Sequence, residues 1–458
     1  MLLRATTVGL VALAAWPAVA ETADLAAIDA YVARKMDDHL LSGLSLAVIH
    51  EGALIHHRGF GGMNAESAIV IGSLSKAITA TAVLQLVDAG KVDLDAPATR
   101  YVPELALAGP EGAAITVRHL LNQTSGLPAS APRANGAEAT LAEHVEALRD
   151  VSLLAKPGER HVYASPNYQV LGRLVELVGG EPFGDYVRRQ VFGPLRMTHS
   201  AIDPGTATAL VPGHNVWWGL QGPSAYRFEP GRLPTASLIS TAGDLARFVL
   251  AHLGGGELDG VRILSPAAVA EAHRGAGQAE GFSYAMGWRA GTTAGLPSLW
   301  HGGALPSYRG ALVMLPETRS GVVVLSNSST LFSDPTREIA AGVAALLHGR
   351  PTPTGIRTQK QVFLMIAALC AVMVGLGLRG VWRAARGPRL APAAARRSAT
   401  IDLLVPAAVV LLVPRFAHVS WRGMLEGAPD IVVTVAILLV LSVASAAFKL
   451  ARREHAAA

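Results

Sequence analysis

The pattern of apolar and polar positions changes along the 458 residues and divides the chain into several parts. Residues 1–20 place an apolar run behind Arg4 and end in Ala-Val-Ala, which is the layout of a secretory signal peptide; an uncleaved N-terminal anchor is the alternative. Residues 21–350 mix helix-like and strand-like periodicity, as a folded exported domain does. Residues 351–361 form a linker that contains prolines, and residues 362–448 are dominated by apolar runs.

The periodicity of the central part predicts an α+β domain. An amphipathic run over residues 23–41 indicates a helix, and two strand-like pieces within residues 44–62 indicate a hairpin. Helical patterns recur up to Gly90, over residues 115–128 and over residues 167–180, each stopping at a glycine. Further strands are predicted over residues 282–290, 298–303, 308–316 and 321–329, and a last helix over residues 335–347. We expect the first and last helices to cover one antiparallel sheet.

Two apolar runs near the C-terminus are long enough to cross a membrane. Residues 362–378 and 431–448 carry no charged side chain and have roughly the length that a transmembrane helix needs. A third run, residues 403–413, is shorter and meets Pro414 and Arg415, so it spans, over residues 403–421, only with the help of its flanking residues. We therefore expect a membrane domain of about three transmembrane helices, followed by a cytoplasmic tail over residues 449–458.

The distribution of charge predicts how these helices are oriented. The segment 379–400 holds six arginines and no acidic residue, and the tail is also basic, so both should face the cytoplasm. Residues 21–350 would then lie on the periplasmic side of the inner membrane. The segment 351–458 holds 13 basic and 4 acidic residues, whereas residues 21–350 hold 25 and 30. The isoelectric point of about 9.5 thus reflects membrane topology, and no nucleic-acid partner is expected.

One short motif stands out for its chemistry. Gly72 begins the stretch Gly-Ser-Leu-Ser-Lys, and its lysine is one of only six among 39 basic residues. Lys76 follows Ser73 by three residues, so on a helix both side chains lie on the same face. A buried lysine can lose its proton and serve as the base for a serine nucleophile, and a helix N-terminus supplies N–H groups for an oxyanion. Alone the spacing is a weak signal, because a capping serine and a solvent-facing lysine would also explain it.

Two further motifs follow Ser73-Leu74-Ser75-Lys76 along the chain. They are Tyr163-Ala164-Ser165 and His301-Gly302-Gly303, with supporting phrases TSGLP (124–128), NYQVLG (167–172) and LSN (325–327). As a set they resemble the serine β-lactamase and penicillin-binding-protein superfamily, specifically its class C β-lactamase and D-Ala-D-Ala carboxypeptidase branch. The resemblance covers roughly residues 25–348. It implies a β-lactamase/transpeptidase-like fold, in which helices flank an antiparallel sheet beside an all-α region.

The resemblance also implies a role for each motif residue. Ser73 would be the acylated nucleophile, Lys76 would tune it, and Tyr163 would shuttle protons. Tyr163 suits this role only if neighbouring cations or donors lower its pKa from about 10, and Lys76 is the candidate neighbour. The N–H of Ala304, just after the third motif, would join that of Ser73 in an oxyanion hole. The two glycines of the third motif would let a substrate backbone approach closely.

Two positions depart from the family pattern. Ser165 stands where the second motif usually has an asparagine that holds a substrate carbonyl, and a hydroxyl is shorter and donates once. His301 stands where dedicated β-lactamases and many carboxypeptidases have a lysine, so the fixed charge for a substrate carboxylate is mostly absent at neutral pH. Efficient β-lactamase activity is therefore not expected. With its membrane tail, the chain looks like the periplasmic membrane-anchored peptidases that activate prodrugs by trimming an acylated D-amino-acid cap.

The expected function is that of an exported, membrane-anchored serine hydrolase. It would form an acyl-enzyme with a small-molecule or peptide substrate, as a peptidase or an esterase does. The alternative is a non-catalytic sensor that binds a β-lactam or a cell-wall fragment in the same pocket. No cofactor and no metal are predicted, since the adjacent His56 and His57 would face opposite sides of a strand. The single cysteine, Cys370, lies in the first predicted span, so the exported domain has no disulfide to form.

Overall fold

A computed structural model gives the fold, and it describes residues 23–134, 136–217, 219–224, 226–329, 333–354, 357–417, 421, 424–425 and 429–452. The predicted signal peptide lies outside the described residues, and so do parts of the predicted middle span and of the C-terminal tail. The strands are β1 (Gly43–His50), β2 (Ala53–Gly61), β3 (Ile69–Val70), β4 (Gly213–Trp217), β5 (Leu220–Ser224), β6 (Ile239–Ser240), β7 (Glu257–Leu258), β8 (Val261–Arg262), β9 (Gly277–Ala279), β10 (Phe282–Ala285), β11 (Trp288–Thr293), β12 (Leu296–Ala304), β13 (Arg309–Leu315), β14 (Ser320–Ser326) and β15 (Ser328–Ser329). The helices are α1 (Leu25–His39), α2 (Ser75–Asp88), α3 (Val117–Leu121), α4 (Leu141–Glu146), α5 (Ser165–Gly179), α6 (Phe183–Val187), α7 (Ala242–Leu253), α8 (Pro266–His273), α9 (Pro335–Leu347), α10 (Gln359–Arg386), α11 (Pro392–Ala417) and α13 (Pro429–Ala451). Short turns of 3-10 or π helix are η1 (Gly72–Leu74), η2 (Ala98–Arg100), η3 (Pro110–Ala114), η4 (Arg188–Phe192), η5 (Pro230–Arg232), η6 (Leu233–Ser237) and η7 (Pro316–Thr318).

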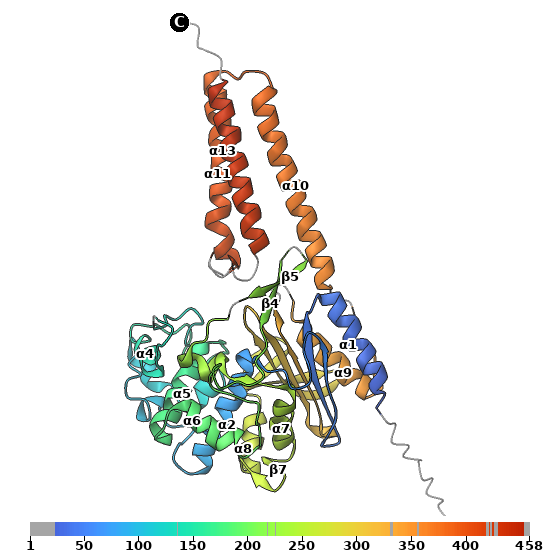
Figure 1. Ribbon diagram of the computed structural model, residues 1–458. Coiled ribbons are helices and arrows are strands. Elements are labelled where there is room, and N and C mark those ends of the chain that lie inside the picture. The colour runs from blue at the N-terminus through green and yellow to red at the C-terminus, as the bar shows by residue number, and fades with distance from the viewer. Residues whose placement is uncertain are drawn as a thin grey trace, which may run out of the picture.

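Eight strands form one antiparallel sheet in the N-terminal domain (Figure 1), in the order β2-β1-β14-β13-β12-β11-β10-β9. The predicted hairpin is present as β1 and β2, and its turn holds Glu51 at φ 50° and Gly52 at φ 80°. Two left-handed residues in a row make the tight turn whose twist matches that of the strands. Leu44 of β1 pairs with Ser326 of β14, so the sheet joins the two ends of the domain.

Helices cover both faces of this sheet (Figure 1). On one face α1 and α9 pack over a core cluster that includes Tyr31, Val48 and Val343. Lys35 of α1 donates a hydrogen bond of 2.6 Å to Glu338 of α9 and ties the two helices together. The expectation that the first and last helices of the domain lie on one sheet is thus confirmed. On the other face α7 contacts β1 and β14, and α2 and α5 build a larger core beside it.

Three predicted elements differ in the structure. The strand predicted over residues 321–329 is β14, which ends at Ser326, and β15, which pairs with β4 in another sheet. The helix predicted over residues 115–128 is α3 and ends at Leu121 rather than at a glycine, because Gln123 takes a left-handed φ of 58° and its carbonyl accepts a hydrogen bond from the loop before α5. The strand predicted over residues 282–290 is two strands, β10 and β11, which fold back at Met286. The other predicted helices and strands of this domain are present, and α9 has its predicted bounds.

Three long helices follow the domain (Figure 1). Of the described helices, α10 and α13 are long and apolar enough to cross a membrane, and most of their apolar residues are not buried, Leu369 and Val440 among them. The predicted middle span corresponds to α11. This helix carries Arg396 and Arg397 near its start and Pro406 inside it. It is not among the described helices that are long and apolar enough to cross a membrane. The third span therefore stays a prediction.

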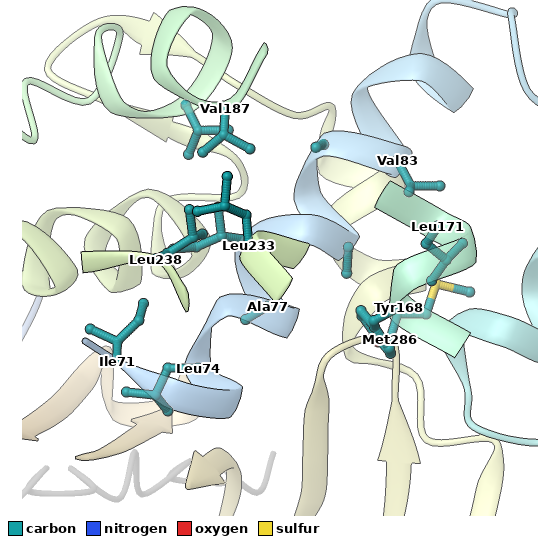
Figure 2. Packing of buried hydrophobic residues seen from close by; sticks show 14 of the residues in the cluster. Ile71, Leu74, Ala77, Val83, Tyr168, Leu171, Val187, Leu233, Leu238 and Met286 are labelled. Carbon is teal, nitrogen blue, oxygen red and sulfur yellow. The ribbon is translucent and has the colours of Figure 1, made fainter. Parts of the chain in front are cut away.

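The turn that carries the Ser-x-x-Lys motif is anchored in the larger core. Ile71 and Leu74, on either side of Ser73, are both buried. Figure 2 shows them beside Leu233 and Leu238, which come from η6 and the residue after it. Because apolar side chains hold the backbone on both sides of Ser73, the position of its hydroxyl depends on this packing.

Candidate active site

Ser73 lies in the 3-10 turn η1, which runs directly into α2. The α-helix itself begins at Ser75, and Gly72 takes a left-handed φ of 57°. Glycine adopts that conformation without strain, and a Cβ at Gly72 would also lie 2.8 Å from the backbone N of Ala304. The glycine therefore lets the Ser73 turn rest against the end of β12.

Lys76 reaches back to Ser73 from the first turn of α2. Its Nζ lies 3.2 Å from Ser73 Oγ and donates a hydrogen bond of 3.0 Å to the carbonyl of Thr235. The side chain is 0 % exposed, and this burial lowers its pKa; two arginines act in the same direction, and Tyr163 acts against them. A lysine with a lowered pKa is more often a neutral amine, which is the form that can accept a proton from a hydroxyl.

Tyr163 comes from the loop before α5 and lies over the same lysine. The Nζ of Lys76 is 5.1 Å from the centre of the Tyr163 ring, and the guanidinium of Arg289 is 5.6 Å from it. The ring is half-buried and packs on the larger core. The fold therefore brings together the serine, lysine and tyrosine that the sequence singled out.

A buried hydrogen-bond network holds the Tyr163 loop in place. The side-chain oxygen of Gln123 accepts from the backbone N–H that follows Tyr163 at 2.9 Å, and from the amide of Asn167 at 2.5 Å. Ser125 Oγ donates a hydrogen bond of 2.5 Å to the side-chain oxygen of the same Asn167. Ser125 and Asn167 belong to the phrases that accompany the three motifs in the sequence. Their contact supports a loop that has no helix or strand of its own.

His301 is fully buried beside Tyr163, with 6.2 Å between the two ring centres. Its Nδ1 donates to the carbonyl of Gly302 at 2.8 Å, and its Nε2 accepts from the hydroxyl of Tyr284 at 3.2 Å. Burial, followed by two nearby cations, lowers the pKa of His301 well below its usual range. The ring is therefore neutral, but both of its nitrogens are engaged inside the protein. In this structure it packs behind Tyr163 and offers no charge to a substrate.

The glycines of the third motif make room for the protein's own chain. A Cβ at Gly303 would lie 2.2 Å from the carbonyl O of Ile71, and one at Gly302 would lie 3.2 Å from the carboxylate of Asp334. Gly303 thus admits the turn that carries Ser73, and close approach by a substrate backbone at these glycines stays a prediction. The exposed residue at the end of β12 is Ala304, whose backbone N lies beside that turn, where an oxyanion hole would need it.

Gly303→Ala is expected to lower turnover about 100-fold, because its methyl group must push the Ile71 carbonyl, and with it the Ser73 turn, away from Ala304. Gly302→Ala is the matched control, since its methyl group would lie 3.2 Å from the Asp334 carboxylate and 3.9 Å from the carbonyl of Gly310, and it should keep most of the activity. Steady-state hydrolysis of an ester by the two purified proteins measures the difference. Equal losses would mean that the approach of the turn to β12 is unimportant.

Ser165, the departure in the second motif, is the first residue of α5 and is half-buried. Its hydroxyl makes no hydrogen bond within the described part of the chain. Ser165 follows Tyr163 by two residues, and its role toward a substrate stays a prediction.

Arg289 of β11 is the site residue that sequence reasoning missed. Its guanidinium stacks on Phe282 at 5.0 Å and on Trp300 at 4.8 Å from the ring centres, and it also faces Tyr163. Its Nε is buried without a hydrogen-bond partner among the described residues. Arg289 thus adds a permanent positive charge beside Tyr163, next to the amine of Lys76. The signal in the sequence was an arginine set among aromatic residues in a predicted strand.

Comparison with known proteins gives the family. The family model described as Beta-lactamase matches residues 28–346. Penicillin-binding protein 4 of Amycolatopsis lactamdurans is 31 % identical over 337 residues, which cover 68 % of this chain and 87 % of that protein. The octameric penicillin-binding protein homologue from Pyrococcus abyssi has a TM-score of 0.63 at 26 % identity, over 72 % of this chain and 78 % of that one.

A D-stereospecific amidohydrolase from Streptomyces sp. has the same fold, with a TM-score of 0.57 at 22 % identity over 67 % of this chain and 94 % of that one. The family match ends at residue 346, before the three C-terminal helices. The fold, the family match and the relatives agree with the resemblance of the three motifs. The chain therefore belongs to the Beta-lactamase family, which is a family of serine hydrolases.

Proposed function

We propose that the chain is an exported, membrane-anchored hydrolase that is acylated on Ser73 by a small amide or ester and releases the acyl group to water. The observation that carries this proposal is the 3.2 Å contact between Lys76 Nζ and Ser73 Oγ, made by a lysine that is fully buried. A lysine exposed to solvent would keep its proton and could not serve as the base for Ser73. Among the described residues, the groups whose charge acts most on the pKa of Lys76 are Tyr163, Arg232 and Arg289, and none of the three is a carboxylate.

The reaction begins when neutral Lys76 takes the proton of the Ser73 hydroxyl while Ser73 Oγ attacks the carbonyl carbon of the substrate. The N–H groups of Ser73 and Ala304 hold the oxyanion of the tetrahedral intermediate. Lys76 returns that proton through Tyr163 to the leaving nitrogen or oxygen, the C–N or C–O bond breaks, and both side chains are neutral again. Water then attacks the carbonyl carbon of the acyl-Ser73 ester while Tyr163 and Lys76 take up one of its protons. The bond from this carbon to Ser73 Oγ breaks, the proton passes to Ser73 Oγ, and the carboxylic acid leaves.

The site favours an acyclic amide or ester over a β-lactam. His301 is neutral and turned inward, so the third motif offers no cation to the carboxylate that a β-lactam carries. Ser165 presents one hydroxyl where a substrate carbonyl would lie. An acylated D-amino-acid cap or an internal peptide bond of a cell-wall peptide meets these conditions, because each is an amide whose carbonyl Ser73 can attack with no adjacent carboxylate for the third motif to bind.

The C-terminal helices support the membrane part of the proposal. At 1.5 Å per residue, the 28 residues of α10 measure about 42 Å, which matches a bilayer with its headgroup regions. Figure 1 shows the hydrolase domain at one end of the three helices and the last residues of α13 at the other. The arginine-rich segment 379–400 joins α10 to α11 at that far end, so the positive-inside rule puts the hydrolase domain on the periplasmic side.

Hydrolysis of three substrate classes by the full-length protein in detergent tests the proposal. A chromogenic acyl ester and an acyl-D-amino-acid amide should both be turned over, and a chromogenic cephalosporin at least about 100-fold more slowly. Turnover of the cephalosporin alone would contradict the proposed substrate class. Tight binding of a β-lactam without turnover of any of the three would favour the sensor instead.

Arg289→Met is expected to slow hydrolysis about tenfold at neutral pH and to shift the pH dependence of acylation toward higher pH. The guanidinium helps to lower the pKa of Lys76, so its removal keeps the lysine protonated, and inactive as a base, up to a higher pH. Arg337→Met is the control, because Arg337 stacks on Trp300 at 4.4 Å and is not among the cations over Tyr163. pH–rate profiles of the two variants decide the matter, and an unshifted profile for Arg289→Met would contradict this role.

A further inference from the structure

We propose that the far end of the helical bundle binds the phosphate of an anionic phospholipid, a proposal that rests on the membrane anchoring proposed above. A hollow of about 270 Å³ lies there between the end of α10, the turn that follows it and the end of α13. Its basic side chains are Arg383, Lys449 and Arg452, and no acidic side chain lines it. We call it the basic hollow. Figure 1 shows this end of the bundle away from the hydrolase domain.

The charges of the basic hollow are only partly neutralised by the protein. Lys449 donates to the carboxylate of Asp402 at 2.7 Å and to Ser398 at 2.9 Å, so its charge already has a partner. Arg452 donates to the carbonyl of Ala385 in the last turn of α10, which holds the guanidinium in place without cancelling its charge. Arg383 forms no side-chain hydrogen bond or ion pair with any described residue. Two positive charges therefore remain for an anion.

The rest of the basic hollow suits a lipid better than a free ion. Pro388 and Leu390 give it an apolar wall. Trp382, the neighbour of Arg383, is 59 % exposed. Tryptophan side chains of membrane proteins are enriched at the level of the lipid headgroups. Leu378, one turn deeper along α10, is also exposed and would lie beside acyl chains. Basic pockets between helices on the cytoplasmic side of a membrane are suited to anionic headgroups.

Native mass spectrometry of the full-length protein, purified in detergent and mixed with phosphatidylglycerol or phosphatidylcholine, tests the site. The unmodified protein should retain phosphatidylglycerol in preference to phosphatidylcholine. Arg383→Gln should weaken phosphatidylglycerol binding roughly fivefold, and the double variant with Arg452→Gln should weaken it roughly 30-fold. Arg397→Gln is the matched control, because Arg397 is an exposed arginine of the same basic segment outside the hollow, and it should bind as the unmodified protein does.

Equal binding in all of these proteins, or equal binding of the two lipids, would overturn the proposal. Full competition by inorganic phosphate at matched concentration would also overturn it, because the hollow would then be a site for a free anion. The single variant Arg383→Gln keeps the test decisive if the double variant unfolds, since Arg383 bonds to no described side chain.

Two separate measurements distinguish this failure from failure of the proposed hydrolase. Loss of serine-probe labelling at Ser73, with phosphatidylglycerol still retained, would refute the hydrolase and leave the lipid site standing. If alkaline carbonate releases the protein from membranes, the proposed membrane anchoring is refuted, and the lipid site is overturned with it.

Discussion

Ser73→Ala is expected to abolish labelling by a fluorophosphonate probe and to lower hydrolysis of every substrate at least about 10⁴-fold, because no acyl-enzyme can form without the hydroxyl. Ser75→Ala is the matched control. Ser75 lies two residues away in the same motif, and its buried hydroxyl has no hydrogen-bond partner in the described residues. Its removal should leave labelling and turnover intact. In-gel fluorescence and steady-state rates of the two purified variants measure the contrast.

The same pair of variants separates the hydrolase from the sensor that the sequence left open. A sensor that binds without acylation would keep its affinity for a ligand in Ser73→Ala and would show no turnover even when unmodified. Labelling that survives in Ser73→Ala would place the nucleophile elsewhere. Equal loss of labelling in Ser75→Ala would show that the motif acts through the fold rather than through one hydroxyl.

Lys76→Met is expected to slow acylation by about 10²- to 10⁴-fold, because Ser73 loses the base that takes its proton. Lys76→Arg should not rescue the reaction, since a guanidinium keeps its proton at any working pH. The pre-steady-state rate of acyl-enzyme formation is the quantity to measure. Full activity of Lys76→Arg would show that the residue acts as a fixed cation, which contradicts the proposed mechanism. Lys91→Met, at an exposed lysine, controls for loss of a lysine as such.

The stability of these variants gives an independent check on the charge of Lys76. Burial lowers the pKa of Lys76 in the folded protein, so between that value and the usual value of about 10.4 the unfolded chain binds the extra proton. Stability contributed by this group therefore rises with pH through that window and is lost as the pH falls. Lys76→Met should remove this part of the pH dependence, so across that window its melting temperature should change less with pH than that of the unmodified protein. Melting curves across pH measure it.

Local features of the site were predictable from the sequence, whereas long-range ones were not. The contact between Ser73 and Lys76 follows from a spacing of three residues, which helix geometry converts into proximity. Tyr163 entered through the resemblance of its motif, because nothing local connects it with Ser73. The carbonyl of Thr235 that accepts from Lys76 lies 159 residues further along the chain, and only the packing of η6 beside α2 brings it there.

The glycines of the third motif show why the rest of the site needed the structure. A glycine can indicate that another group lies close to its backbone, but which group that is depends on tertiary packing. At Gly303 it is the protein's own carbonyl at Ile71. Arg289 was missed for a related reason, because its importance comes from the ring of Tyr163, which a distant loop supplies. The strand pattern could not show that Arg289 and Tyr163 meet.

The fold was predictable where periodicity is strong and was misjudged where a turn lacks the usual residues. Glu51-Gly52 is a tight turn between alternating strands, and the hairpin was predicted. The turn between β10 and β11 begins with Met286 at φ 24°, a residue that rarely adopts a positive φ, and the two strands were predicted as one. In α11 the basic residues at the start and the internal prolines weaken the apolar signal, so the sequence and the structure both leave its passage through a membrane as a prediction.

The most direct test of the central claim is intact-protein mass spectrometry of the full-length protein during turnover of an acyl-D-amino-acid amide. The account predicts a transient mass increase equal to the acyl group, located by peptide mapping on Ser73, which disappears as substrate is exhausted and is absent in Ser73→Ala. Slower deacylation in Tyr163→Phe should make the adduct accumulate. Hydrolysis that proceeds with no adduct in either protein, or an adduct on a residue other than Ser73, would contradict the account.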